Sequence, residues 1–129
     1  MVDIILVSHS LKLVEGLKEL VLEMASEVKI YAVGGTKDGE IGTDFDQILD
    51  TFHHVGEDGA VVLFDLGSSY MASQMAYEAL PESLQSKIQL VDAPLVEGSI
   101  EAAVLAGIGK TKPMIVEKLA KYKLGKIQD

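Results

Sequence analysis

Apolar runs of strand length alternate along this chain with segments that have a helical period. The expected strands cover residues 3–8, 28–33, 59–67 and 88–94. The expected helices are residues 11–25, a segment from Thr43 or Asp44 to near Val55, a segment from Ser68 or Ser69 to just before Pro81, residues 96–107 and a segment from near Pro113. This alternation is typical of consecutive βαβ units. The sequence therefore predicts a doubly wound α/β fold, with a mainly parallel sheet flanked by helices, in a single domain of residues 1–129.

The segment 11–25 shows the helical period most clearly. Its apolar residues recur three and four positions apart, and they are Leu13, Leu17, Leu20, Val21 and Met24. Such spacing predicts an amphipathic helix, for which Ser10 is the expected N-cap. By contrast, residues 34–44 are polar and rich in glycine, which predicts a loop.

The charge balance limits the kinds of partner that the chain can bind. Eleven basic residues, all of them lysine, stand against twenty acidic residues and give a net charge of −9. Nucleic acid requires a basic surface, so no nucleic-acid partner is expected. The acidic surface is explained either by solubility alone or by docking with a basic protein partner.

The composition also bears on compartment and chemistry. The chain has no cysteine, which excludes disulfides, thiolate metal sites and thiol catalysis. No apolar run approaches the roughly 18 residues that a membrane-spanning helix needs. The first residues lack the pattern of a secretory signal. We therefore expect a cytoplasmic protein without a membrane partner.

The strongest candidate site lies where the predicted strands end. In a doubly wound sheet, ligands bind beyond the carboxyl ends of the strands, where loops meet helix N-termini. His9 follows the first strand and Asp65 lies at the end of the third. A carboxylate bonded to one ring nitrogen fixes the imidazole tautomer and leaves the other nitrogen as a nucleophile or base. The sequence thus predicts that His9 and Asp65 form a catalytic pair.

The residues around this pair suit an anion such as a phosphoryl group. Helix N-termini present free N–H groups, and small residues leave room for a ligand. The candidate phosphate-binding residues are Ser10, Thr36, Gly67, Ser68 and Ser69. No metal site is expected, because the adjacent His53 and His54 point in different directions on a helix and no third ligand is spaced to join them.

Several alternatives remain open from the residues alone. His9 and Asp65 are also explained as hydrogen-bonded structural residues at strand ends. A non-catalytic interaction module and a His-Asp hydrolase that uses Ser10 or Ser68 as nucleophile are further hypotheses. Dinucleotide, P-loop and nucleophile-elbow motifs are missing from the sequence.

Four blocks of sequence resemble a known family. They are ILVSHSLKLVEGLKELV, GGTKDGEIGTDFDQI, VVLFDLGSSYM and DAPLVEGSIEAAVLAG. Together they resemble DhaM, the phosphotransferase subunit family of the phosphoenolpyruvate-dependent dihydroxyacetone kinases, which is related to the mannose-class enzyme IIA domains. The resemblance extends from Val2 to about Gly109.

The resemblance implies a phosphoryl relay without a cofactor of its own. His9 would be the phosphorylated histidine and Asp65 the carboxylate that orients it. The phosphoryl group would come from the phosphocarrier protein HPr and pass to ADP bound in the DhaL subunit, which phosphorylates dihydroxyacetone. The family also implies a homodimer. The alternative is a mannose-class enzyme IIA that passes phosphate to a IIB domain; that pattern has Gly-Gly-Ser-Pro after the aspartate, whereas this chain has Leu66-Gly67-Ser68-Ser69.

Overall fold

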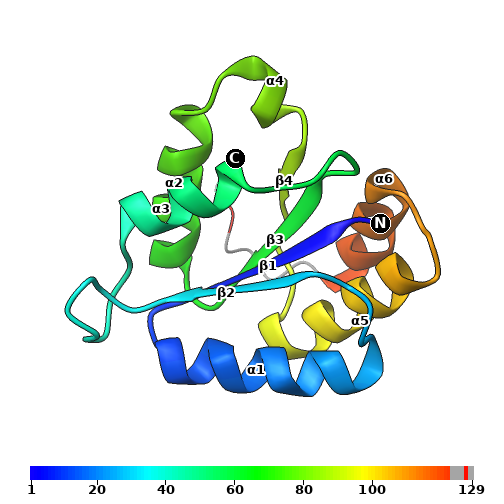
Figure 1. The fold of residues 1–129 in the computed structure, drawn as a ribbon, viewed down its shortest axis with the longest axis horizontal. Helices are drawn as coiled ribbons and strands as arrows, with labels where there is room; N and C mark the ends of the chain where they lie inside the picture. Colours follow the sequence, from blue (N-terminus) through cyan, green and yellow to red (C-terminus); the bar gives the residue numbers. More distant parts are fainter. Residues whose placement is uncertain (123–126, 128–129) are drawn as a thin grey trace.

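The computed structural model describes residues 1–122 and residue 127. Four parallel strands form one sheet in the order β2-β1-β3-β4 (Figure 1). The strands are β1 (Asp3–Ser8), β2 (Ile30–Gly34), β3 (Ala60–Phe64) and β4 (Ile88–Leu90). The chain proceeds from β1 to β2 and then returns to the other side of β1 for β3 and β4. The prediction of a doubly wound α/β fold with a parallel sheet is therefore confirmed.

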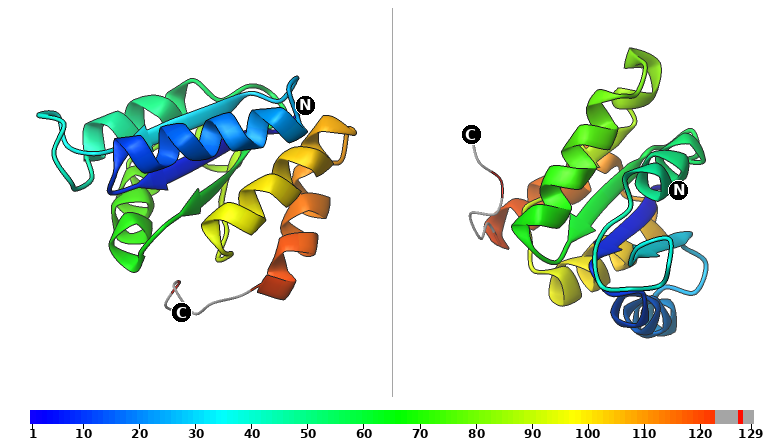
Figure 2. Two further views of the ribbon diagram at one scale, coloured as in Figure 1. Left: turned by 90° about the horizontal axis from the view of Figure 1, so that it is seen from below. Right: turned by 90° about the vertical axis from the view of Figure 1, so that its left-hand side faces the viewer.

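Helices cover both faces of the sheet. They are α1 (Leu11–Met24), α2 (Phe45–His53), α3 (Gly67–Glu78), the short α4 (Glu82–Gln85), α5 (Leu95–Gly107) and α6 (Lys112–Leu119), which is followed by the 3₁₀ helix η1 (Ala120–Tyr122). Helices α1, α5 and α6 pack on one face, while α2 and α3 pack on the other (Figure 2). Within the part of the chain that the structure describes, no helix has the length and apolar character of a membrane span.

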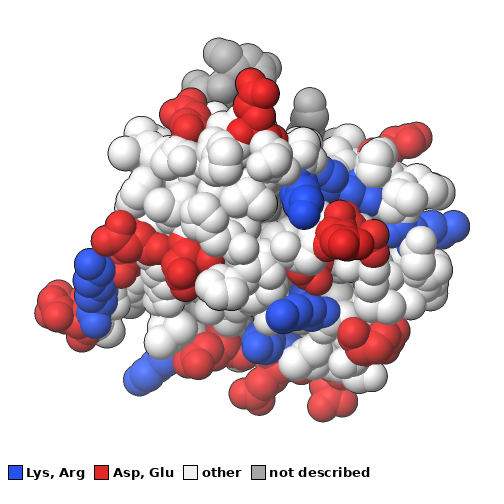
Figure 3. Space-filling view, turned by 45° about the horizontal axis from the view of Figure 1, so that its top comes forward, with Lys and Arg blue, Asp and Glu red and all other residues white. Residues whose placement is uncertain are grey.

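The charged side chains do not separate by sign on the surface that Figure 3 displays. There, carboxylates and lysines are interspersed around an area without charged side chains. An excess of acidic residues spread in this way favours solubility, and the area without charged side chains can make uncharged contacts.

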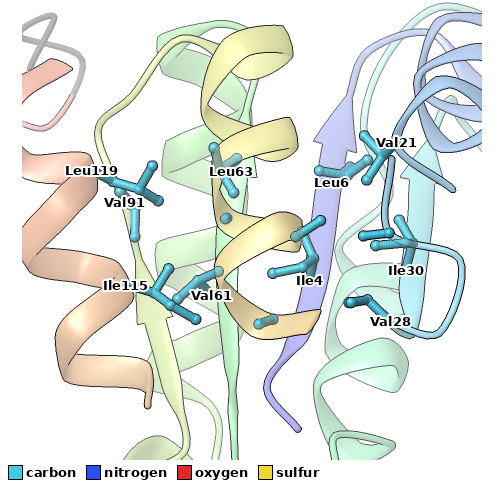
Figure 4. Packing of buried hydrophobic residues seen from close by; sticks show 14 of the residues in the cluster. Ile4, Leu6, Val21, Val28, Ile30, Val61, Leu63, Val91, Ile115 and Leu119 are labelled. Carbon is cyan, nitrogen blue, oxygen red and sulfur yellow. The ribbon is translucent and has the colours of Figure 1, made fainter. Parts of the chain in front are cut away.

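The core consists of two apolar clusters, one on each face of the sheet. Side chains of a strand alternate between the faces, so Ile4 and Leu6 belong to the first cluster and Ile5 and Val7 to the second. Figure 4 shows part of the first cluster, in which strand residues face α5 and α6. All five residues of β3 are buried, as expected for a strand covered on both faces. Because both faces are closed, a ligand can reach the strands only at their ends.

Helix α1 buries less of its apolar surface than its sequence offers. The buried residues are Val14, Leu17 and Val21, which face the sheet. Leu13, Leu20 and Met24 are 47%, 43% and 58% exposed. The apolar repeat thus identified the helix correctly, but part of the repeat lies outside the core of this subunit.

Some boundaries differ from those expected. Strand β3 spans 60–64 rather than 59–67, and β4 spans 88–90 rather than 88–94, because the chain leaves each ladder to approach the following helix. The sequence analysis also missed α4, a single turn after Pro81. Ser10 and Asp44 are confirmed as N-caps of α1 and α2, since each side chain accepts a backbone N–H from the first helical turn.

Candidate phosphotransfer site

His9 lies in a tight connection between a strand and a helix. It follows Ser8, the last residue of β1, and precedes Ser10, the N-cap of α1. The N–H of Gly42 donates to the carbonyl oxygen of His9 at 2.8 Å. Gly34 packs so closely that a Cβ atom there would lie 3.0 Å from the carbonyl oxygens of Ser8 and Ser10. Neighbouring backbone thus holds His9 in place from the β2 side.

Asp65 reaches the same imidazole from the adjacent strand. β1 and β3 pair with Val7 opposite Phe64, so His9 and Asp65 leave neighbouring strands at the same edge. Nδ1 of His9 lies 3.1 Å from Oδ1 of Asp65, and the two side chains are 21% and 16% exposed. The predicted proximity of His9 and Asp65 is therefore confirmed by the geometry.

Five hydrogen bonds converge on the carboxylate of Asp65. Oδ1 accepts from Nδ1 of His9, the N–H of Leu66 and the hydroxyl of Ser69. Oδ2 accepts from the hydroxyl of Ser8 and the N–H of His9. Burial by itself would raise the pKa of Asp65, but the hydrogen bonds from Ser69, His9, Ser8 and Leu66 outweigh burial and hold this pKa well below its usual range. Asp65 is therefore an anion, and both of its oxygens can only accept hydrogen bonds.

The anionic carboxylate determines which nitrogen of His9 is free. Since Oδ1 of Asp65 can only accept, Nδ1 of a neutral His9 carries the proton of this hydrogen bond. Nε2 then has the lone pair, and it lies 2.7 Å from Oγ of Ser68, which donates to it. The atom of His9 that can act as a nucleophile is consequently Nε2.

The start of α3 differs from the prediction in its cap. The expected N-cap, Ser68 or Ser69, is wrong: Leu66 is the N-cap, and both serines lie in the first turn. Their hydroxyls are directed to the site instead, because Ser68 bonds Nε2 of His9 while Ser69 bonds Asp65 at 2.6 Å and lies 3.0 Å from Nδ1. Ser69 is fully buried. The serine hydroxyls in the first turn of α3 thus bond His9 and Asp65 rather than cap the backbone of the helix.

The other predicted phosphate-binding residues lie around this centre in different ways. Gly67 and Ser68 open α3, where the first N–H groups have no partner within the helix. The hydroxyl oxygen of Ser10 accepts the N–H of Leu13, which leaves its proton available for a ligand. The hydroxyl of Thr36 accepts the N–H of Glu40 within the β2–α2 loop. Direct contact of these residues with a phosphoryl group stays a prediction.

Ser8 is a site residue that the sequence analysis did not include among its candidates. Its hydroxyl contacts both Asp65 and the N–H of Ser10, and the residue is fully buried. A signal was present, since a polar residue ends an otherwise apolar strand directly before His9. A buried hydroxyl requires a hydrogen-bond partner, and the partner could have been sought at the same edge.

His53 and His54 lie outside this site. His53 is the last residue of α2 and His54 is its C-cap, and Nδ1 of His54 lies 2.7 Å from the carbonyl oxygen of Asp50. Across residues 1–122 and 127, no group of three or more His, Asp or Glu side chains is arranged to hold a metal ion.

Comparison with known proteins identifies the class to which this fold and site belong. The family model described as PTS system fructose IIA component, EIIA-man, matches residues 3–116. The protein is a phosphotransferase component of the phosphotransferase-system type, with a mannose-class α/β fold. The chain belongs to the EIIA-man family.

Curated relatives narrow the resemblance. The "PEP-dependent dihydroxyacetone kinase 2, phosphoryl donor subunit DhaM" of Listeria innocua is 39% identical over 121 residues, which cover 92% of this chain and 97% of that protein. The "PTS-dependent dihydroxyacetone kinase, phosphotransferase subunit DhaM" of Lactococcus lactis is 34% identical, with 95% and 97% covered. The DhaM of Escherichia coli is 36% identical, and the match covers 84% of this chain but 24% of that protein. The resemblance to DhaM is thus confirmed.

Solved structures agree with the fold. A crystal structure described as unknown function protein EF1359 has a TM-score of 0.84 at 38% identity and covers 93% of both chains. A sigma-54 interaction domain protein from Enterococcus faecalis has a TM-score of 0.72 at 16% identity, with 92% of this chain and 87% of that chain covered, and this likeness concerns the fold alone.

Proposed function

We propose that this protein is the phosphoryl donor subunit of a phosphoenolpyruvate-dependent dihydroxyacetone kinase. In this role Nε2 of His9 accepts a phosphoryl group from HPr and passes it to ADP bound in the DhaL subunit. The observation that carries the proposal is the imidazole whose Nδ1 bonds the anionic Asp65 while its Nε2 is turned toward the start of α3. The names of the DhaM relatives, which describe phosphoryl donor subunits of dihydroxyacetone kinases, support dihydroxyacetone as the final substrate.

The first transfer needs one nucleophile and one leaving group in line. The lone pair of Nε2 attacks the phosphorus atom of the donor's phosphohistidine, and the donor's phosphorus–nitrogen bond breaks with its electron pair returning to the donor imidazole. His9 keeps its proton on Nδ1 and becomes positively charged. Asp65 stabilises that charge through the existing 3.1 Å contact, so no proton has to move at His9.

The second transfer reverses the chemistry toward an oxygen acceptor. A terminal phosphate oxygen of ADP attacks the phosphorus atom, the bond to Nε2 breaks, and the electron pair returns to the ring of His9. The product is ATP in the acceptor subunit, and His9 is again neutral with its proton on Nδ1. The same Nδ1 hydrogen bond to Asp65 therefore serves both half-reactions.

The phosphoryl oxygens require donors around Nε2. The N–H groups of Gly67 and Ser68 and the hydroxyls of Ser68 and Ser10 are the proposed contacts, with Thr36 reaching the group from the β2–α2 loop. The buried Ser69 supports the phosphoryl group indirectly, since its hydroxyl holds Asp65. Ser68 has to rotate during the reaction, because its hydroxyl stands 2.7 Å from Nε2 where phosphorus must enter.

The assembly is part of the proposal. A homodimer is supported by the apolar side chains that α1 and α5 leave exposed, which include Leu13, Leu20, Met24, Val96 and Val104. A contact between two such faces would remove this apolar surface from water. The net charge of −9 supports docking of a basic phosphocarrier, and a cytoplasmic location would bring these proteins together.

The direct test is labelling with radioactive phosphoenolpyruvate in the presence of enzyme I and HPr. We expect one phosphate per chain, stable in base and labile in acid, and no label in His9→Ala. His54→Ala, which removes an exposed histidine at the end of α2, should label normally. Label that persists in His9→Ala would contradict the assignment.

The acceptor is tested in a second step. Phosphorylated protein should lose its phosphate to DhaL with bound ADP and not to a IIB domain. Transfer to IIB alone would instead identify a sugar-transport enzyme IIA. Failure of both acceptors, with partner function retained in His9→Ala, would favour a non-catalytic interaction module.

A further inference from the structure

Ser8 carries a buried hydroxyl to which the proposed mechanism assigns no step. The residue is the last of β1, and its exposed fraction is 0%. Its Oγ donates to Oδ2 of Asp65 at 2.9 Å and accepts the N–H of Ser10 at 3.0 Å. One hydroxyl therefore joins the carboxylate behind the imidazole to the N-cap of the following helix.

The two oxygens of Asp65 have different environments. Oδ1 accepts from Nδ1 of His9 and also from Leu66 and Ser69 at the start of α3, whereas Oδ2 accepts from the hydroxyl of Ser8 and the backbone N–H of His9. Rotation of the carboxylate about its Cβ–Cγ bond would move Oδ1 away from Nδ1. The two donors on Oδ2 oppose this rotation, because each of them is directional and belongs either to the last residue of β1 or to the residue that follows it. Loss of the Ser8 donor leaves a single backbone bond to hold Oδ2.

We propose that Ser8 is a positioning residue for phosphoryl transfer at His9. Its hydroxyl fixes the orientation of the Asp65 carboxylate, which keeps the proton of His9 on Nδ1 and the lone pair on Nε2. Ser8 acts through Asp65 and through the backbone of Ser10, and it contacts neither Nε2 nor the phosphoryl group. The inference rests on the proposed function, in which Nε2 is the nucleophile.

The first experiment needs no partner protein. Nuclear magnetic resonance of ¹⁵N-histidine-labelled protein at neutral to mildly basic pH reports the tautomer of His9 and the exchange of its Nδ1 proton with water. In Ser8→Ala we expect this proton to exchange about tenfold faster than in the wild type. Without the Ser8 hydroxyl the hydrogen bond from Nδ1 to Asp65 is weaker and opens more often, and the free energy of a hydrogen bond to a charged group corresponds to about this factor. Exchange and tautomer that match the wild type would overturn the proposal.

Ser99→Ala is the matched control. Ser99 is as fully buried as Ser8, and its hydroxyl donates to the carbonyl oxygen of Val96 at 3.0 Å, away from the site. It should lower stability without altering His9. If Ser8→Ala does not fold, Ser8→Cys keeps the side-chain size with a weaker donor and should show the same faster exchange in a protein with a native circular dichroism spectrum.

The second experiment asks whether Ser8 acts through Asp65. Ser8→Ala should slow phosphorylation of His9 by about tenfold in the native protein and by no further factor in Asp65→Asn, because residues in one network are not additive. Independent slowing in both backgrounds would overturn the proposal. If the wild type takes up no phosphoryl group, the proposed function fails, while the resonance comparison still decides whether Ser8 positions His9.

Discussion

Nε2 of His9 and Oγ of Ser68 lie 2.7 Å apart, so the nucleophilic nitrogen and the first hydroxyl of α3 are in direct contact before any phosphoryl group arrives. In the proposed mechanism, phosphorus would bind between these two atoms. The contact also joins the starts of two helices, because His9 lies just before the N-cap of α1 and Ser68 lies in the first turn of α3.

Ser68→Ala should slow phosphorylation of His9 by roughly a hundredfold, since one aimed donor to a developing charge contributes about that factor. The melting temperature should stay within a degree or two of the wild type, because Ser68 is exposed and replaceable in a helix. Rapid-quench labelling measures the rate, and thermal unfolding measures stability. An unchanged rate would show that Ser68 gives no support to the phosphoryl group.

Asp65→Asn should slow phosphorylation by at least about a hundredfold, because the amide cannot balance the positive charge of phosphorylated His9 and can donate to Nδ1, which favours the wrong tautomer. Asp46→Asn is the control, since Asp46 is 70% exposed and pairs with Lys37 outside the site. Equal rates for the two variants in the labelling assay would contradict the role of Asp65.

Asp65 should also shape the acid stability of the protein. Its pKa is lower in the folded chain than in the unfolded one, so the unfolded state binds the proton more readily. The stability that this difference supplies is complete above the unfolded pKa of about 4 and is lost as the pH falls below it. Urea unfolding between pH 7 and pH 3 should show a shallower acid limb for Asp65→Asn, and parallel curves would contradict this expectation.

Gly34→Ala and Gly16→Ala should change stability in opposite directions. A Cβ at Gly34 meets two carbonyl oxygens at 3.0 Å and a backbone nitrogen at 3.1 Å, so the His9 connection must shift, at about 1–3 kcal/mol. Gly16 lies within α1 and a Cβ there meets nothing within 4 Å, so alanine should stabilise by about 0.5–1 kcal/mol. Urea unfolding checks both signs, and a neutral Gly34→Ala would refute the close packing.

Replacement of both Leu20 and Met24 by lysine should convert the proposed homodimer into a monomer in sedimentation velocity. Both side chains are exposed on α1, so the fold of the subunit should persist. Met71 and Met75 are 65% and 61% exposed on α3, across the sheet, and their replacement by lysine is the control. Dissociation by the control pair alone would move the interface to the other face.

The fold and the central pair were predictable because they depend on patterns that the chain carries locally. Apolar runs located the strands, and the rule that parallel strands end at one edge brought His9 to Asp65 across 56 positions of sequence. The roles of Ser8, Ser68 and Ser69 were less accessible. A serine near the start of a helix is expected as a cap and as a ligand contact alike, and only the structure shows that Leu66 is the N-cap and that α3 begins at Gly67.

The exposure of α1 could not be read from its repeat either. Five apolar residues share a broad stripe, but the width of the contact with the sheet determines how many of them are buried. That width depends on how closely α5 packs beside α1, which is a property of the whole layer rather than of either helix.

Because Nδ1 of His9 is hydrogen-bonded to Asp65, Nε2 is the one ring nitrogen that can react with another protein. In the proposed relay, the donor protein and the acceptor protein would both need Nε2 and would therefore dock one after the other. Under this proposal, excess acceptor without a phosphoryl group would compete with the donor for the site, so the rate of transfer would depend on the ratio of the two proteins as well as on their concentrations.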